Sequence, residues 1–367
     1  MTVLSSAGFR RAKAEITSWS GYAPTPLRDL PDIARRSGLA AIRLKDEAPR
    51  FGLQSFKALG GAYAVVSLLL DELARTGAAP GAHTAELEAG AHQPATERLI
   101  MTCATDGNHG RAVAWAAQRF GARCVVFIHA AVSQARADAI ARYGAEIRRV
   151  RGTYDDAVRE TARTADLHHW HVVSDTSWPG YTEIPRTIMQ GYRLMVDEAA
   201  DQWTGDPPTH VFIQGGVGGL AAAVSIHMRA QFKPGPMIVV VEPDRAACLL
   251  ASAERGNRTA IAGDLDTLMA GLACGEPSLL AWQELERGAA AFMAIPDEAA
   301  VDAMRLLARR RIESGESGAA GLAGLLLATS DPATRTSLGL NGASRVLAFS
   351  TEGATDTALY ARLTQQV

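Results

Sequence analysis

The sequence is poor in cysteine and has no strong excess of either charge. Its four cysteines, in 367 residues, show no CxxC or Cys/His ligand spacing, so we expect no zinc site or other metal centre. Buried free thiols are the simplest expectation, and whether Cys248 and Cys274 pair stays open. A net charge of −2 argues against the polycationic surface that nucleic acid or an acidic membrane would need as a partner.

Long apolar runs and a leader segment are also missing. No apolar run reaches the length of about 20 residues that a transmembrane helix needs, so we expect no membrane span. The first residues include Arg10, Arg11 and Lys13 and lack the apolar core of a secretory signal, so we expect a cytoplasmic protein. What is present, 47% hydrophobic and 21% charged residues, describes a globular chain of two domains or one large α/β unit.

Strands and helices alternate through much of the chain. Between residues 99 and 175 short apolar strands alternate with helical segments, and a second alternating set begins after Trp178. This pattern predicts βαβ units and parallel sheets, whereas residues 75–98 have no periodicity and are expected to form a loop. We therefore predict an α/β fold of two lobes, with parallel-type sheets flanked by helices and the active site in the cleft between them. The expected domains are residues 1–57 with 179–367, and residues 58–178.

The segment FGLQSFKALGGAY places Lys57 between Phe56 and Ala58, with Gly60 and Gly61 close behind. An ammonium among apolar and small residues loses hydration, which lowers its pKa and makes it a good Schiff-base nucleophile. A surface lysine on the first turn of a helix, with its stem packed and its head in water, would explain the same pattern. This segment alone leaves both interpretations open.

A turn of small and polar residues, TDGNHG, follows the predicted strand that ends near Cys103. Small residues between a strand and a helix let a ligand approach the backbone and the helix N-terminus. Asn108 offers both donors and an acceptor, and Asp106 is an acid just ahead of the helix. The structural alternative is an ordinary Asp/Asn-Gly turn with a capping acid.

A glycine loop lies between the apolar strand HVFI and an Ala-rich helix. The loop comprises Gly215, Gly216, Val217, Gly218 and Gly219. Such a loop forms a phosphate cradle of backbone N–H groups at a helix start. It also fits the dinucleotide fingerprint G-x-G-x-x-A from Gly216, with Glu242 as the ribose-binding acid, so a nicotinamide-dependent oxidoreductase competes. Together with a desolvated lysine and an Asn-bearing loop, the cradle suits pyridoxal phosphate.

Two further segments place polar groups beside apolar elements. Asp175 and Tyr181 lie in DTSWPGY, between the two alternating sets, where a substrate-facing loop and plain interface packing both fit. Ser350 and Thr351 follow the closing strand RVLAF. One of these hydroxyls is a candidate partner for a pyridine nitrogen, and an ordinary turn or N-cap is the alternative.

Taken together, the segments resemble a known family. The tryptophan-synthase-β-like family, the fold type II pyridoxal phosphate enzymes, has lysine, asparagine, glycine-loop and terminal-hydroxyl motifs similar to SFKALGGAYA, TDGNHGRAVAWAA, GGVGGL and FSTEG. Its diaminopropionate ammonia-lyase branch resembles this chain in SDTSWPGYTEIPRTIMQGY, MAGLACGEPS and ESGESGAAGLAGL. The likeness runs from about Tyr22 to the C-terminus. Asp106 agrees with this branch and departs from the threonine dehydratases.

The resemblance implies an α,β-elimination of 2,3-diaminopropionate, with water, to pyruvate and ammonia. Lys57 would hold pyridoxal 5′-phosphate and take the Cα proton of one enantiomer, and Asp106 would take it from the D form. Asp175 would bind the substrate's amino group. The other implied contacts are Asn108 with the 3′-oxygen, Gly215 to Gly219 with the phosphate, Thr351 or Ser350 with the pyridine nitrogen, and Ser55 and Tyr181 with the substrate.

The resemblance also implies a homodimer that acts as a carbon–nitrogen lyase on a small amino acid. A serine/threonine dehydratase of the same fold is the nearest alternative. An oxidoreductase that uses the GGVGGLA segment for NAD(P) is a distant one, and a non-catalytic α/β binding protein is more distant still.

Overall fold

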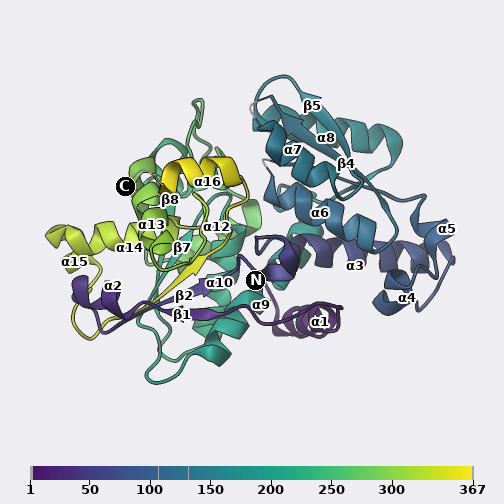
Figure 1. Ribbon diagram of the computed structural model, residues 1–367. Helices are drawn as coiled ribbons and strands as arrows, with labels where there is room; N and C mark the ends of the chain where they lie inside the picture. Colours follow the sequence, from purple (N-terminus) through teal and green to yellow (C-terminus); the bar gives the residue numbers. More distant parts are fainter. Residues whose placement is uncertain (1–2, 106, 131, 366–367) are drawn as a thin grey trace.

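The computed structural model describes residues 3–105, 107–130 and 132–365. Over these residues the strands form two separate sheets, which lie in different halves of the molecule (Figure 1). The expected two-lobed α/β fold, with parallel-type sheets flanked by helices, is confirmed. The domain boundaries at residues 57 and 178 stay a prediction. No helix in the described part of the chain combines the length and apolar character needed to cross a membrane.

The larger sheet has the strand order β1-β2-β10-β7-β8-β9. Its described neighbours pair in parallel except at one edge, where β1 runs antiparallel to β2. With only three residues, β1 is too short to show the alternation of apolar and polar residues that marks a strand in the sequence. The strands are β1 (Leu27–Asp29), β2 (Ala41–Asp46), β7 (His210–Gln214), β8 (Met237–Pro243), β9 (Ala291–Ile295) and β10 (Arg345–Ser350).

Both faces of the larger sheet are buried, which explains why its central strands read as continuous apolar runs. In β7, for example, Val211 and Ile213 join one hydrophobic cluster and Phe212 joins another. The first cluster includes α1 (Ser6–Thr17), α9 (Glu183–Gln202), α10 (Gly219–Gln231), α11 (Cys248–Arg255) and α12 (Leu279–Gly288). The second includes α2 (Pro31–Arg36), α13 (Asp297–Ala308) and α14 (Ala320–Ser330), against which α15 (Pro332–Ser337) and α16 (Thr357–Thr364) pack.

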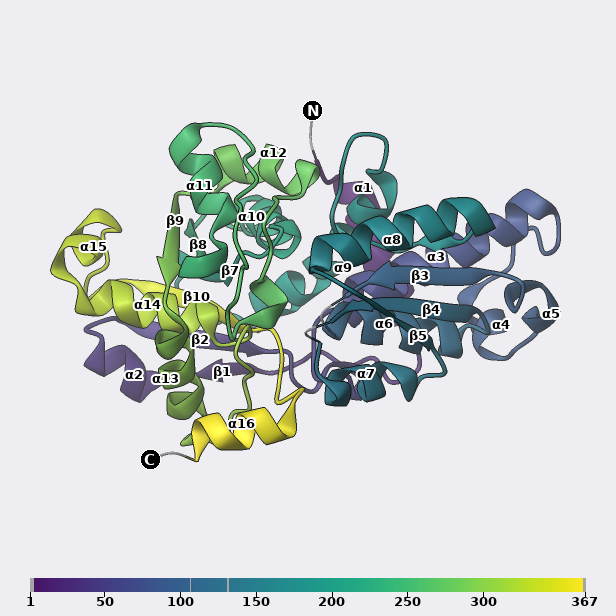
Figure 2. The ribbon, with the colours of Figure 1, turned by 90° about the horizontal axis from the view of Figure 1, so that it is seen from above.

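The smaller sheet has the order β5-β4-β3-β6, and its paired strands run parallel as predicted. Helices α6 and α8 contact β3 and β4 from opposite faces (Figure 2). The strands are β3 (Ile100–Ala104), β4 (Arg123–His129), β5 (Glu146–Val150) and β6 (His171–Val172). The helices are α3 (Ala58–Thr76), α6 (Asn108–Arg119), α7 (Gln134–Ala141) and α8 (Tyr154–His168).

The segment of residues 75–98 is not the plain loop that the sequence predicted. It contains two short helices, α4 (Thr84–Glu88) and α5 (Gln93–Thr96). Each is too short to show a helical period, so the only local sign was the capping box between His83 and Glu86.

Helix α3 begins at Ala58, directly after Lys57, and lies unusually close to α9. A Cβ atom on Gly191 would lie 1.9 Å from the carbonyl oxygen of Leu59. A Cβ atom on Gly60 would lie 2.5 Å from Cε1 of Tyr192. These glycines are therefore packing residues, and they let the helix that carries Lys57 rest directly on α9.

Candidate active site

A pocket opens at the carboxyl ends of strands from both sheets. Gln214 ends β7, Thr351 follows β10, and Thr105 follows β3. In open parallel sheets this end is where ligands commonly bind. The pocket brings together the sequence-predicted residues Lys57, Asn108, Asp175, Gly215, Gly216, Val217, Gly219 and Thr351.

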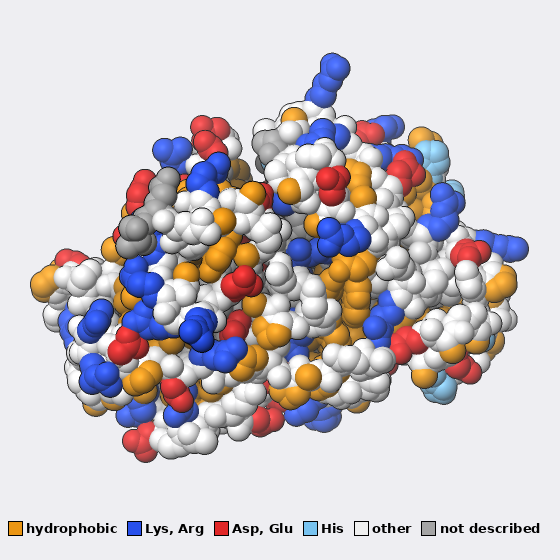
Figure 3. All heavy atoms as spheres, viewed as in Figure 1, with side chains coloured by type: hydrophobic (Ala, Val, Ile, Leu, Met, Phe, Trp, Pro, Cys, Tyr) orange, Lys and Arg blue, Asp and Glu red, His pale blue; other side chains and the backbone are white. Residues whose placement is uncertain are grey.

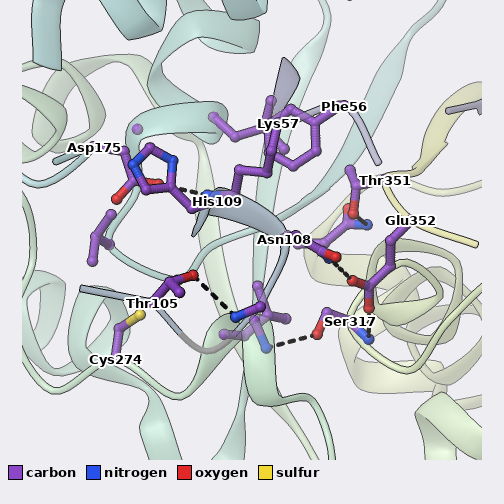
Figure 4. Close-up of a pocket in the computed structure, with 18 of the residues that line it drawn as sticks. Phe56, Lys57, Thr105, Asn108, His109, Asp175, Cys274, Ser317, Thr351 and Glu352 are labelled. Carbon is purple, nitrogen blue, oxygen red and sulfur yellow. Dashed lines mark hydrogen bonds and ion pairs between the residues drawn. The ribbon is translucent and has the colours of Figure 1, made fainter. Parts of the chain in front are cut away.

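Lys57 points across the pocket toward Asp175 (Figure 4). Its Nζ lies 2.5 Å from Asp175 Oδ2, and the two side chains are only 20% and 12% exposed. The surface-lysine alternative therefore does not hold, because the ammonium is enclosed and paired.

The pKa values of this pair follow from burial and from their mutual charge. Burial lowers the pKa of Lys57, as the sequence argument expected, but the charge of Asp175 and the hydrogen bond to it outweigh burial and raise that pKa. Burial likewise raises the pKa of Asp175, and the charge of Lys57 brings it down to about 2. The net direction for Lys57 is opposite to the expectation, because its partner lies 118 residues away in the sequence.

The side-chain amide of Asn108 is held on both sides. Arg111 Nη2 donates to its Oδ1 over 2.9 Å, and its Nδ2 donates to Glu352, which follows β10 (Figure 4). Glu352 also accepts a hydrogen bond of 3.0 Å from the backbone N–H of Ser317. A guanidinium only donates and a carboxylate only accepts, so the orientation of the amide is fixed. The second hydrogen of its NH₂ group is available to a ligand oxygen.

The glycine loop has the backbone shape of an anion cradle. Gly216 and Gly218 have φ angles of 60° and 93°, in the left-handed region that glycine adopts at little cost. Gly218 is the N-cap residue of α10, and no side chain of its own caps the helix. The first N–H groups of α10 thus have no partner within the helix, and the helix dipole makes this end positive.

Unpartnered polar atoms also mark this pocket as a binding site. Among the described residues, His109 Nδ1, Arg111 Nε and Gln214 Oε1 are buried without a hydrogen-bond partner, and all three residues line the pocket. His109 Nε2 lies 2.7 Å from the carbonyl oxygen of Val173, so Nε2 carries the proton and Nδ1 keeps a lone pair. Burial lowers the pKa of His109. An enclosed amine, an anion cradle and spare polar groups fit pyridoxal phosphate.

Glu242 does not play the part that a dinucleotide site would need. Its carboxylate is fully buried and accepts hydrogen bonds of 2.8 Å from the backbone N–H groups of Leu249 and Leu250, at the start of α11. It is a helix cap and does not line the pocket. Burial raises the pKa of this carboxyl to about 7, although the two N–H groups act to lower it.

This raised pKa predicts a pH-dependent loss of stability. Between the ordinary glutamate value of 4.5 and about 7, the folded state holds a proton that the unfolded state has lost. The free energy of unfolding should therefore fall as pH rises through this window, with a contribution from Glu242 of roughly 3 kcal/mol at most. Glu242→Gln should flatten the pH dependence of the urea midpoint, whereas Glu298→Gln, at an exposed site, should not. Equal slopes in all three proteins would contradict this.

Several predicted site residues lie outside the pocket lining. Ser350 Oγ donates to Ser314 Oγ over 2.8 Å, and Tyr181 donates to the carbonyl oxygen of Val172 over 2.8 Å. Ser55 forms a backbone bridge with Glu352, and its Oγ accepts a hydrogen bond of 3.3 Å from the backbone N–H of Lys57. Gly218 lies behind its loop neighbours and does not line the pocket. Asp106 lies outside the described residues.

Other residues that line the pocket were not predicted from the sequence. These are, among others, Phe56, His109, Arg111, Arg136, Tyr192, Gln214, Cys274, Ser317 and Glu352. Glu352 directly follows the predicted Thr351, and Arg111 lies one helical turn after Asn108, so local spacing was a usable signal for both. No such signal existed for Arg136, whose Nη2 pairs with Glu316 Oε1 at 2.6 Å across the two halves of the molecule.

The structure also shows whether Cys248 forms a disulfide and how charge is distributed on one face of the molecule. Cys248 carries a free, buried thiol whose Sγ lies 3.7 Å from the carbonyl oxygen of Gly216, so it forms no disulfide. On the face shown in Figure 3, acidic and basic side chains are mixed, which agrees with the near-neutral net charge of −2.

Comparison with known proteins places this architecture among characterised enzymes. A family model described as "Pyridoxal-phosphate dependent enzyme" matches residues 19–349. Diaminopropionate ammonia-lyase of Escherichia coli (strain K12) is 42% identical over 357 residues, which cover 93% of this chain and 87% of that protein.

Solved structures of the Escherichia coli enzyme have the same fold as this chain. A crystal structure in complex with D-serine superposes with a TM-score of 0.90 at 39% identity, over 99% of this chain and 93% of the other. A second, in complex with an aminoacrylate-PLP azomethine reaction intermediate, gives a TM-score of 0.88 at 39% identity with the same coverage.

Proposed function

The chain belongs to the pyridoxal-phosphate-dependent enzymes and, within them, to the diaminopropionate ammonia-lyases, and on that premise we propose that it accepts both D- and L-2,3-diaminopropionate. With water, the elimination yields pyruvate and two molecules of ammonia. One observation carries the assignment of the pocket: the Lys57 amine, the Asn108 amide and the glycine loop line the same pocket although they are far apart in the sequence. Family membership and the use of Glu242 as a helix cap speak against the oxidoreductase alternative.

The residues that would hold the cofactor follow from their contacts. Lys57 would supply the amine for covalent attachment, and the N–H groups of the loop from Gly215 to Gly219 would receive the phosphate. Asn108, oriented by Arg111 and Glu352, would donate its free hydrogen to the 3′-oxygen. When bound, pyridoxal phosphate supplies the electron-withdrawing ring that makes the substrate's Cα proton acidic.

Asp175 is suited to receive the substrate's amino group. It already holds one ammonium, that of Lys57, at 2.5 Å, and this pairing keeps the carboxylate ionised, with a pKa of about 2. Once Lys57 is engaged with the cofactor, this buried carboxylate needs another cation, and the substrate brings one. Asp175 therefore orients the substrate beside the lysine that reacts with it.

We propose that proton removal from the substrate is divided between two groups. We assign removal of the Cα proton to Lys57 for the L form and to Asp106 for the D form. Asp106 lies outside the described residues, but its neighbours Thr105 and Gly107 line the pocket. Lys57, protonated after it takes the Cα proton, is placed to give a proton to the departing β-amine.

Pyruvate release from the purified holoenzyme tests this function. We expect strong release from both enantiomers of diaminopropionate, and little from serine or threonine assayed in parallel. Release from L-serine or L-threonine alone would keep the fold and cofactor and replace the substrate by that of a dehydratase.

We also propose that the protein is a homodimer and works in the cytoplasm. The family resemblance supports the first point, and the free thiols of Cys103, Cys124 and Cys248 suit a reducing compartment. Light scattering should give twice the chain mass of 38.9 kDa, and a value for a single chain would contradict the dimer.

A further inference from the structure

Gln214 ends β7 directly before the glycine loop and is 1% exposed. Its Nε2 lies 2.7 Å from the carbonyl oxygen of Gly318, 3.0 Å from that of Phe349 and 3.0 Å from Thr351 Oγ1. A backbone carbonyl can only accept, so two of these three neighbours require the NH₂ group of the amide on this side. The orientation of Gln214 is thus fixed by the backbone around it.

This orientation leaves a buried hydrogen-bond acceptor of Gln214 without a partner. The other end of the amide, Gln214 Oε1, is buried and has no hydrogen-bond partner among the described residues. A buried acceptor without a partner is unfavourable and calls for an explanation. Turning the amide over would set its oxygen against two carbonyl oxygens, so the NH₂ group stays toward Thr351.

The orientation of Gln214 determines where the hydroxyl hydrogen of Thr351 points. The NH₂ group of Gln214 has two hydrogens for three acceptors, so Thr351 Oγ1 shares one of them with a carbonyl oxygen. Because the amide nitrogen cannot accept a hydrogen bond, the hydroxyl hydrogen of Thr351 points away from Gln214. No described residue accepts the hydroxyl hydrogen of Thr351, and this side chain lines the pocket. Thr351 therefore offers a donor to whatever lies against it. Ser350, the alternative partner, donates to Ser314 and faces away.

We infer that Gln214 is a positioning residue, which fixes the Thr351 hydroxyl as a hydrogen-bond donor and so holds the cofactor's pyridine nitrogen in its unprotonated form. The inference rests on the proposed function, because the family resemblance that supports this function implies a contact between Thr351 and the pyridine nitrogen. Gln214 acts on the pyridine nitrogen through Thr351. An unprotonated nitrogen withdraws electrons less strongly, which limits how far charge spreads from the substrate's Cα into the ring.

The test uses holoenzyme reconstituted with cofactor that carries an isotopic label at the pyridine nitrogen, observed by NMR. In the wild type we expect the chemical shift of an unprotonated nitrogen. Gln214→Glu should reverse the direction of the Thr351 bond, because a buried carboxyl kept neutral by two carbonyl oxygens can accept from Thr351. Its nitrogen signal should move toward the protonated value.

A second variant separates positioning from simple packing. Gln214→Met keeps the length of the side chain but cannot donate, so Thr351 is no longer fixed. We expect the cofactor to bind about five- to tenfold more weakly, with a nitrogen signal between the two limits. A residue that only fills space would leave the nitrogen shift unchanged in both variants.

The outcomes distinguish this inference from the proposed function. An active holoenzyme whose wild-type nitrogen is protonated, or whose shift is the same in Gln214→Glu, overturns the inference and leaves the function standing. The wild-type measurement needs no variant to fold. A wild-type protein that binds no cofactor overturns both.

Discussion

Lys57→Ala is expected to lower pyruvate release from both enantiomers by about ten-thousandfold or more, since it removes the amine that holds the cofactor and moves the proton. The variant also leaves Asp175 buried without the cation that now lies 2.5 Å from it. Cofactor binding should become non-covalent. The mass of borohydride-reduced protein measures this directly, because only a lysine-bound cofactor is fixed to the chain by reduction.

Lys57→Arg is the matched control for this experiment. It keeps a cation beside Asp175 and so protects the buried carboxylate, but a guanidinium does not form the covalent bond. We expect Lys57→Arg to be as inactive as Lys57→Ala and more stable to urea. Covalently bound cofactor in either variant, or activity within tenfold of the wild type, would remove Lys57 from the mechanism.

The sequence alone predicted the pieces of this site better than their contacts. Lys57, Asn108 and the glycine loop stood out because small or apolar neighbours around a polar group are locally unusual. In the structure Lys57, Asn108 and all of the loop except Gly218 line one pocket. The pairing of Lys57 with Asp175 was not predictable, because it depends on how two distant segments pack. It reversed the expected direction of the Lys57 pKa.

In the fold, too, elements with a clear local pattern could be predicted from the sequence, and elements without one could not. Parallel βαβ units produce apolar runs and caps that are visible in the sequence, such as Ser133, whose side chain caps α7 by accepting from the backbone N–H of Arg136. The antiparallel edge strand β1 and the short helices α4 and α5 have too few residues for a period to appear. The role of Tyr181 as a substrate contact stays a prediction; its hydroxyl binds the backbone of Ser174 and Val172, contacts that composition does not reveal.

Asp106→Asn is expected to separate the two enantiomers of the substrate. If Asp106 takes the Cα proton from the D form, its loss should lower turnover of D-diaminopropionate on the order of 100- to 10,000-fold and leave L turnover nearly intact. Asparagine has nearly the same size and shape as aspartate and removes only the basic oxygen. Initial rates of pyruvate release with each pure enantiomer measure the ratio, and Asp71→Asn, at an exposed site on α3, should change neither rate.

Asp175→Asn should give a different pattern, because this carboxylate is paired with Lys57 and Lys57 serves both enantiomers. Without the charge of Asp175, burial is left to lower the pKa of Lys57, and the substrate's ammonium loses its partner. Both enantiomers should therefore slow together. The comparison assigns the roles: a D-selective loss in Asp106→Asn beside a common loss in Asp175→Asn supports two separate bases. If Asp106→Asn lowered turnover of the two enantiomers equally, Asp106 would have no separate role in proton removal. Removal of the Cα proton from both enantiomers would then be assigned to Lys57.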